Sequence, residues 1–408
     1  MTQSLRVQAA YLLSSSSVQT LINLLSSLVL MRLLVPEAFG RFTFVQAGVA
    51  LLPTFLGLRL GQVVLRFKTL EPDSDEMNQL RSWLSAQTLL FAVSAILVAS
   101  VLRATPIETL LATAQCALNP WMVVQTRLVE RQQRYKSVAV AEFASVAVSN
   151  AIAVGFAVAY PVGALVLFSR QPLRVVIQSM LLTRICSPLT LVPRHRLSLS
   201  LSFVRRNVGD LWSDSLFEQA YERGVLLFAG SIVGERELGS FAQARTLAAL
   251  PIALSEPLTQ RLVLRRFTMD PNTLPTLSQK LAIGFAFLGL LAAAVAAGLG
   301  PPVISYVFGE KWDLAGGLLV PLAFVPWSGF QLGLSKSAAI ASRSMTFYLR
   351  FVRTTQFLAF GVCVSILLLT HVVAASQALA WAYTAGLTAA ALAALVLRFG
   401  RRFPTISH

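Results

Sequence analysis

The arginines inside apolar stretches are the residues of this sequence best suited to chemistry. Arg170 and Arg174 stand one helical turn apart near the middle of the apolar stretch 162–183. A charge near the centre of a membrane helix costs about 2.5–3.5 kcal/mol on insertion scales, so it normally faces protein or water. Three other arginines also fall in apolar stretches: Arg59, Arg223 and Arg245. Because guanidinium groups bind phosphate through paired N–H donors, these five arginines form a candidate cavity site for a phosphate-bearing substrate.

A structural role for the same charges remains open. Arginines and carboxylates of neighbouring stretches can neutralise one another between two halves of a membrane protein. In that case Arg170 and Arg174 would bind no ligand.

Carboxylates recur every fourth residue along 207–233, and the set is Asp210, Asp214, Glu218 and Glu222. A four-residue step keeps side chains on one slowly rotating helix face. Asp210 and Asp214 fit the cytoplasmic end, where solvated charges are ordinary. Glu218 and Glu222 are predicted to lie deeper, where a desolvated carboxylate can take up a proton or bind a cation. They are the candidates for ion coupling.

The stretch 8–31 is rich in serine and contains Gln19 and Asn23 at a four-residue spacing. Such a face favours close packing of helices through small residues. The alternative is that Gln19 and Asn23 line an aqueous path.

The composition identifies the elements that must position these side chains. Of 408 residues, 55% are hydrophobic and 13% are charged, about half the charged share of soluble proteins. A water-soluble globule is therefore excluded. The formal net charge is +16, which in a membrane protein is stored in cytoplasmic loops, so no nucleic-acid partner is expected.

The motifs of soluble enzymes are missing from the sequence. The three cysteines and three histidines are scattered, so we expect no disulfide framework and no metal site. The sequence contains no phosphate loop and no plausible Ser-His-Asp arrangement. We therefore predict no catalytic residues, no cofactor and no enzymatic activity.

Charge-free runs predict an all-α polytopic membrane protein with about twelve transmembrane helices in two six-helix lobes around a central cavity. The predicted spans are 8–31, 42–65, 82–102, 107–128, 138–159, 162–183, 207–233, 240–260, 281–299, 314–340, 346–370 and 374–397. With both termini cytoplasmic, most Lys and Arg fall in cytoplasmic loops. The predicted outside loops are short, and the longest covers residues 300–313.

A loose repeat supports two halves. Residues 35–42 and 234–241 each contain an apolar residue, then Gly, one further residue and Phe at the start of a span. Two halves of six spans enter from the same side, so their pseudo-two-fold axis runs along the membrane normal. The predicted domains are an N-terminal lobe at 1–190, a basic cytoplasmic linker at 191–206 and a C-terminal lobe at 207–408.

Three local patterns resemble the multidrug/oligosaccharidyl-lipid/polysaccharide exporter superfamily, and within it the bacterial O-antigen and exopolysaccharide flippases. They are RLLVPEAFG at 32–40, LGSFAQA at 238–244 and FGEKWDLA at 308–315. The resemblance implies a two-lobed inner-membrane transporter with a cationic cavity. It would pass undecaprenyl-pyrophosphate-linked oligosaccharide repeat units from the cytoplasmic to the periplasmic leaflet by alternating access. None of the three patterns contains the five arginines, whose assignment rests on depth and charge.

The resemblance also implies partners. The expected ones are a lipid-linked oligosaccharide, membrane lipid, H⁺ or Na⁺ as the coupling ion, and the polymerase or export proteins of polysaccharide synthesis. One alternative function is a drug/cation antiporter of the same superfamily, which would want an acidic or apolar cavity. Another is a membrane-embedded polysaccharide polymerase or glycosyltransferase, which usually needs a larger outside loop than this sequence provides.

Overall fold

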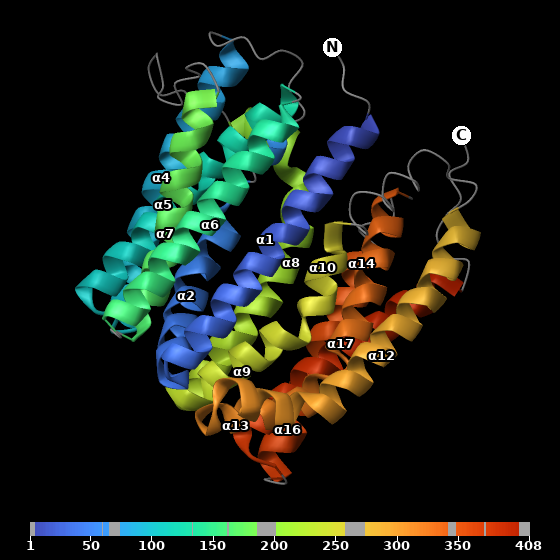
Figure 1. The fold of residues 1–408 in the computed structure, drawn as a ribbon. Coiled ribbons are helices and arrows are strands. Elements are labelled where there is room, and N and C mark those ends of the chain that lie inside the picture. Colours follow the sequence, from blue (N-terminus) through green and yellow to red (C-terminus); the bar gives the residue numbers. More distant parts are fainter. Residues whose placement is uncertain are drawn as a thin grey trace. The chain divides into compact units, whose positions relative to one another are not determined.

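The computed structural model describes residues 5–58, 60–64, 74–132, 134–160, 163–185, 201–257, 274–341, 348–370 and 373–399. Regular structure in this part of the chain is entirely helical, and each of the twelve predicted spans holds one helix or a broken helix (Figure 1). The first half contains α1 (Leu5–Leu33), α2 (Pro36–Leu56), α3 (Leu60–Val64), α4 (Asp75–Val101), α5 (Pro106–Arg131), α6 (Tyr135–Ala159) and α7 (Ala164–Ile185). The second half contains α8 (Leu201–Ile232), α9 (Glu235–Ala248), α10 (Leu250–Pro257), α12 (Leu274–Phe308), α13 (Asp313–Leu322), α14 (Val325–Ala341), α16 (Thr354–Thr370) and α17 (Ala375–Phe399), with short turns η3 (Glu310–Trp312) and η4 (Leu349–Arg353).

Helix length and apolarity make this a multi-pass membrane protein. Seven helices in the described residues are long and apolar enough to cross a bilayer, or eight if the bent pair Glu310–Leu322 and Val325–Ala339 counts as one span. On α12, Ile283, Phe287 and Leu291 form a stripe whose side chains are 68%, 69% and 53% exposed. Exposure of such an apolar stripe to water is unfavourable, whereas contact with lipid tails is favourable. The full number of twelve transmembrane helices stays a prediction.

The first compact unit comprises residues 1–34 and 41–227. Within it α4 packs on α5, α5 on α7, α7 on α6, and α6 on α1, and α4 to α7 run side by side in Figure 1. The short α3 closes one part of this unit, where its apolar residues join those of α4 and α5 in one buried cluster: Leu60, Val63, Val64, Met77, Leu80, Leu84, Val124 and Leu128.

The second compact unit comprises residues 35–40 and 228–408. Within it α16 packs on α17, α12 on α13 and α14, and α14 on α17. The two units divide inside α8, after Leu227, and the predicted linker at 191–206 lies mostly outside the described residues. The predicted lobe boundaries therefore stay a prediction.

The two repeat segments pack on each other inside this second unit. A Cβ added at Gly40 would lie 1.7 Å from the carbonyl oxygen of Glu235, and one added at Gly239 would lie 1.9 Å from the carbonyl oxygen of Pro36. The offset 239 − 40 equals the offset 235 − 36, so the two contacts are equivalent positions of the repeat meeting reciprocally. Reciprocal contact of this kind is what a two-fold relation between segments produces. The glycines allow the two backbones to approach this closely.

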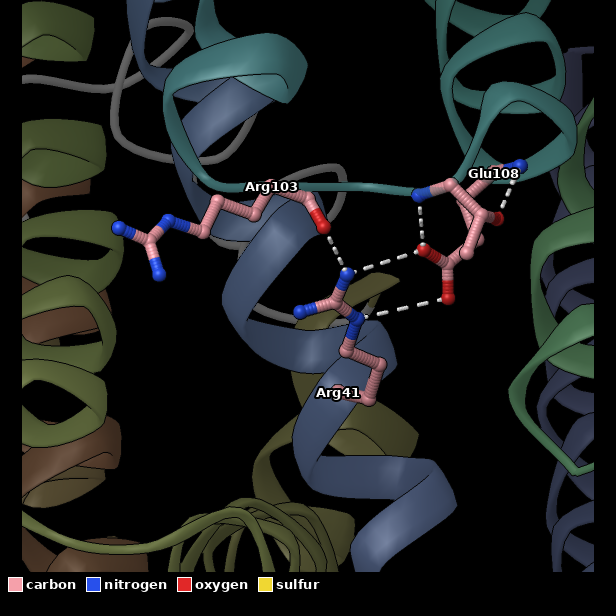
Figure 2. A network of polar contacts seen from close by, with 4 residues as sticks. Arg41, Arg103 and Glu108 are labelled. Carbon is pink, nitrogen blue, oxygen red and sulfur yellow. Dashed lines mark hydrogen bonds and ion pairs between the residues drawn. The ribbon is translucent and has the colours of Figure 1, made fainter.

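An arginine clamp joins α2 to the turn between α4 and α5 in the first unit (Figure 2). Arg41 Nη2 donates to the carbonyl oxygen of Arg103 at 2.6 Å and to Glu108 Oε2 at 3.2 Å. Glu108 also accepts from the backbone N–H of Thr105, whose hydroxyl in turn accepts from the N–H of Glu108. This reciprocal capping box fixes the start of α5, and Arg41 ties it to α2.

The prediction that residues 300–313 form a loop is wrong, because most of this segment is helical. The helix α12 continues through Pro301 and Pro302 to Phe308, and η3 follows after a single turn at Gly309, whose φ is +87°. Proline and glycine suggest a break in sequence. In apolar surroundings, however, the flanking backbone groups find no better partners than the helix itself.

Candidate functional site

A partly buried polar network joins α1, α6 and α7 in the first unit. Asn23 Oδ1 on α1 accepts from Arg170 Nη2 on α7 at 2.6 Å and from Asn150 Nδ2 on α6 at 3.1 Å. One turn earlier on α1, Gln19 Nε2 donates to Glu142 Oε2 at 3.1 Å. The polar face predicted on the first span is therefore a set of hydrogen-bonding partners for α6 and α7, beyond simple packing of small residues.

The two arginines of α7 stand deep in their helix. Arg174 occupies the midpoint of the candidate span Ala164–Arg184. Its Nε is buried and has no hydrogen-bond partner, while Glu142 is near enough to interact with its charge. In the described part of the chain, neither Arg170 nor Arg174 forms an ion pair with a carboxylate. One carboxylate near two guanidinium groups leaves the network with a positive balance, as an anion site requires.

Gln178, one turn beyond Arg174, has a hydrogen-bond contact at both ends of its side-chain amide. Its Oε1 accepts from Ser145 Oγ at 3.5 Å, and its Nε2 donates to Thr126 Oγ1 at 3.3 Å. Gln178 is 2% exposed. Its bonds connect α5, α6 and α7, so Gln178 stabilises the arrangement that holds the arginines.

A second polar site lies elsewhere in the first unit, among α2, α3, α4, α5 and α8. It is a cavity of about 330 Å³, at the small end of the usual range for ligand pockets. Arg223 lines it together with five side-chain amides, which are Gln46, Gln87, Gln115, Asn119 and Gln219. We call this cavity the amide pocket.

Helix breaks shape the amide pocket. Pro53 lies inside α2, and α2 ends at Leu56, after which Gly57 and Leu58 are not helical. Since Pro53 has no N–H, the carbonyl of Val49 has no helical donor, and the thiol of Cys116 on α5 lies 3.9 Å from it. Interrupted helices at a polar cavity are a common design of transporter binding sites.

Of the other predicted residues, Arg223 lines the amide pocket. Arg245 belongs to the second unit, where its guanidinium lies 5.5 Å from the centre of the Tyr383 ring. Glu218 and Glu222 are half-buried on α8, one residue before Gln219 and Arg223, and so on a neighbouring stripe of that helix. Arg59 and the side chains of Asp210 and Asp214 lie outside what the structure describes. Within the first unit, Arg223 lines the amide pocket, whereas Arg170 and Arg174 are not part of its lining.

The amides of the second site were not anticipated from the sequence. Each stands in an apolar helix, where an uncharged glutamine or asparagine gives a weak signal. The prolines at 53 and 120, which flank the pocket on α2 and α5, were the available hint. Among the described residues no group of three His, Cys, Asp or Glu side chains is placed to hold a metal.

Comparison with solved structures shows the fold. The lipid II flippase MurJ in an inward closed conformation matches with a TM-score of 0.69 at 12% identity, over 94% of this chain and 86% of that one. An inward-facing multidrug resistance MATE family transporter matches with a TM-score of 0.65 at 15% identity, over 96% and 98%. A MOP superfamily transporter from Pyrococcus furiosus matches with a TM-score of 0.61 at 12% identity, over 97% and 95%. A search of curated protein sequences gave no significant match.

These likenesses show that the chain has the fold of the MATE family transporters and of the lipid II flippase MurJ. The family model described as "Polysaccharide biosynthesis protein" matches residues 29–315, and the chain belongs to that family. The resemblance drawn from the three sequence patterns is confirmed.

Proposed function

We propose that this protein is a flippase that moves undecaprenyl-pyrophosphate-linked oligosaccharide repeat units from the cytoplasmic to the periplasmic leaflet by alternating access. Membership of a polysaccharide biosynthesis family supports a glycan substrate. The fold shared with a lipid II flippase supports a lipid-linked one. In this proposal the protein sits in the bacterial inner membrane with both termini cytoplasmic.

The observation that carries the proposal is the state of Arg170 and Arg174. Both stand within a candidate span, and their bonding partners are not carboxylates: Arg170 binds the neutral amide of Asn23, and Nε of Arg174 binds nothing. A buried, unsatisfied N–H on a cation is costly. An oxygen of a pyrophosphate would satisfy it through a charge-assisted hydrogen bond, the strong kind. We assign the pyrophosphate contact to this pair, with Arg59, Arg223 and Arg245 as further candidates and Glu218 and Glu222 for H⁺ or Na⁺ coupling.

The test is translocation in proteoliposomes that contain the purified chain and an undecaprenyl-pyrophosphate-linked oligosaccharide. A lectin added outside reports the glycans that reach the outer leaflet. We expect the protein to make the inner pool accessible, and the charge-neutral double variant Arg170→Gln/Arg174→Gln to abolish this while its thermal unfolding stays close to that of the unaltered protein. Arg184→Gln is the matched control, because Arg184 lies at the exposed end of the same helix.

Normal translocation by the double variant would remove the phosphate contact from these arginines. Transport of a cationic dye in place of the lipid-linked glycan would favour the antiporter alternative. Sugar transfer to an acceptor by the purified protein would favour the polymerase or glycosyltransferase alternative.

A further inference from the structure

The amide pocket contains two buried amides whose hydrogen bonds are incomplete. Gln46 on α2 is 8% exposed and Gln87 on α4 is 7% exposed. Oε1 of each is buried and has no hydrogen-bond partner, and both side chains line the pocket. Gln178 in the same unit is equally buried but bonded at both ends. The unit therefore provides hydrogen-bond partners for the buried Gln178, but not for the Oε1 atoms of Gln46 and Gln87 at the pocket.

Amides that lack hydrogen-bond partners next to a cavity indicate a ligand that supplies the missing hydrogen bonds. A buried polar group without a partner lowers the stability of the folded state, whereas an apolar residue of similar shape does not. A hydroxyl that takes the place of a bridging water keeps the hydrogen bonds of that water. A side-chain amide offers one acceptor and one donor group, and a hydroxyl group also does both. The amides and hydroxyls are therefore complementary.

The charges of the lining decide against a cation. Arg223 brings a positive group to the pocket, and the described residues of the lining include no aspartate or glutamate. Calcium and magnesium sites usually include carboxylate ligands, and a guanidinium group nearby repels any cation. The lining suits a neutral ligand with several hydroxyls, and the ring of Phe91, also in the lining, gives such a ligand an apolar face to rest on.

From these observations we propose that the amide pocket binds one pyranose ring of a glycan, with Gln46 and Gln87 hydrogen-bonded to its hydroxyls and Arg223 at its edge. The size of the cavity, about 330 Å³, accommodates a small ligand and not a whole oligosaccharide. The proposal rests on the proposed function for the source of the sugar, which is the lipid-linked repeat unit. Binding of the ring itself depends only on the pocket.

The experiment uses the full-length protein in lipid nanodiscs and the variants Gln46→Met and Gln87→Met, which replace the amide by an apolar chain of similar length. Saturation-transfer NMR with free glucose, galactose, mannose and N-acetylglucosamine measures binding, and sodium chloride and pyrophosphate serve as competing probes. We expect saturable binding of at least one sugar, weakened about tenfold or more by each substitution, since each removes a hydrogen bond to the ligand.

Thermal unfolding of the same variants separates binding from folding. Because the pocket amides lack protein partners, Gln46→Met and Gln87→Met should unfold at the same temperature as the unaltered protein or higher. Gln178→Met is the matched control: it breaks two hydrogen bonds among α5, α6 and α7, so it should lower the unfolding temperature and leave sugar affinity unchanged.

Absence of binding of all four sugars, or equal binding to the Met variants, overturns the inference. Sodium binding that the Gln46→Met variant loses overturns it in favour of a cation site. The translocation assay distinguishes this failure from failure of the proposed function. If translocation stays normal in both Met variants, the sugar site at the amide pocket is refuted and the flippase function stands. If the unaltered protein binds sugar but does not translocate the lipid-linked glycan, the flippase function is refuted and the sugar site stands.

Discussion

The reciprocal contact of the two repeat segments leads to a sharp prediction about Gly40 and Gly239. Alanine at position 40 would place its Cβ 1.7 Å from a backbone oxygen of residue 235, and real Cβ atoms essentially never come within 3.0 Å of such an atom. The segments must then separate by about 1.3 Å. No side-chain rotation relieves the clash, because the opposing atom belongs to the backbone.

The cost follows from that separation. Overpacking in a tight core costs about 1–3 kcal/mol, and a backbone clash belongs at the upper end. Alanine in place of glycine regains about 1 kcal/mol of helix propensity. We expect a net loss of about 2 kcal/mol for Gly40→Ala, and a similar loss for Gly239→Ala. The edge-on contact of Phe39 with Trp312, whose ring centres are 5.3 Å apart, should loosen at the same time.

Thermal unfolding of the purified protein, followed by tryptophan fluorescence, is the assay. For a chain of 408 residues that unfolds as a whole, a loss of about 2 kcal/mol lowers the unfolding temperature by roughly 2–3 °C. Gly284→Ala is the matched control, because a Cβ there meets nothing within 4 Å and should stabilise slightly. The double variant Gly40→Ala/Gly239→Ala should lose less than the sum of the single losses, since the first substitution already separates the segments.

Two outcomes would refute this reasoning. Stabilisation by both Gly40→Ala and Gly239→Ala, as at the open control position, would mean that the segments do not touch. Full additivity of the two losses would mean that the two contacts are independent and not one reciprocal interface.

Three further predictions follow from single contacts. Glu108→Ala removes the capping box and the partner of Arg41, so we expect about 2 kcal/mol less stability, whereas Glu108→Gln should lose less because it can still accept; chemical or thermal unfolding distinguishes the two. Gly309→Ala forces a side chain into the left-handed region at φ +87°, and unfolding should show a loss of about 1–2 kcal/mol. Asn23→Leu leaves Arg170 without its acceptor, so translocation should fall more than with Asn23→Asp, which keeps an oxygen there; equal activity of the two variants would contradict a positioning role for Asn23.

The helices were predictable because a bilayer leaves the backbone few choices. Every predicted span holds a helix, as expected where unpaired N–H and C=O groups find no water. The breaks inside spans were less accessible. The pattern 42–65 reads as one span, yet α2 ends at Leu56 and α3 begins at Leu60, because Pro53 and Gly57 weaken the helix at a place where the pocket accommodates the interruption.

The candidate residues were predictable where one residue type is costly by itself. Arg170 and Arg174 are conspicuous in the sequence because a guanidinium in an apolar stretch has a high free-energy cost that a partner or a ligand must offset. Their partners required the fold: nothing in the sequence says that Asn23, far away on α1, meets Arg170. The repeat was visible as a pattern, but its meaning, a reciprocal backbone contact at Gly40 and Gly239, depends on coordinates.

The amide pocket could not be foreseen for a different physical reason. An uncharged glutamine costs little free energy in a membrane helix, so its presence in the sequence does not indicate a site. Only the lack of a hydrogen-bond partner in the structure is informative. That lack appears when Gln46 and Gln87, from two separate helices, are found around one cavity. A site with buried charges can thus be predicted from the sequence. A site with unsatisfied amides can be found only from the structure.

The two proposals together concern a ligand of two parts, a pyrophosphate group and a sugar. In the proposed function cations bind the pyrophosphate, and Arg170 and Arg174 would supply them inside the candidate span Ala164–Arg184. A sugar ring is recognised through several weak, directional hydrogen bonds. Amides supply these bonds without the desolvation cost that additional charged groups would bring. If both proposals hold, loss of Arg170 and Arg174 should abolish translocation of every pyrophosphate-linked glycan. Loss of Gln46 or Gln87 should instead alter which glycans are moved. Equal loss of all substrates in the glutamine variants would place those amides in the general transport step and not in selection.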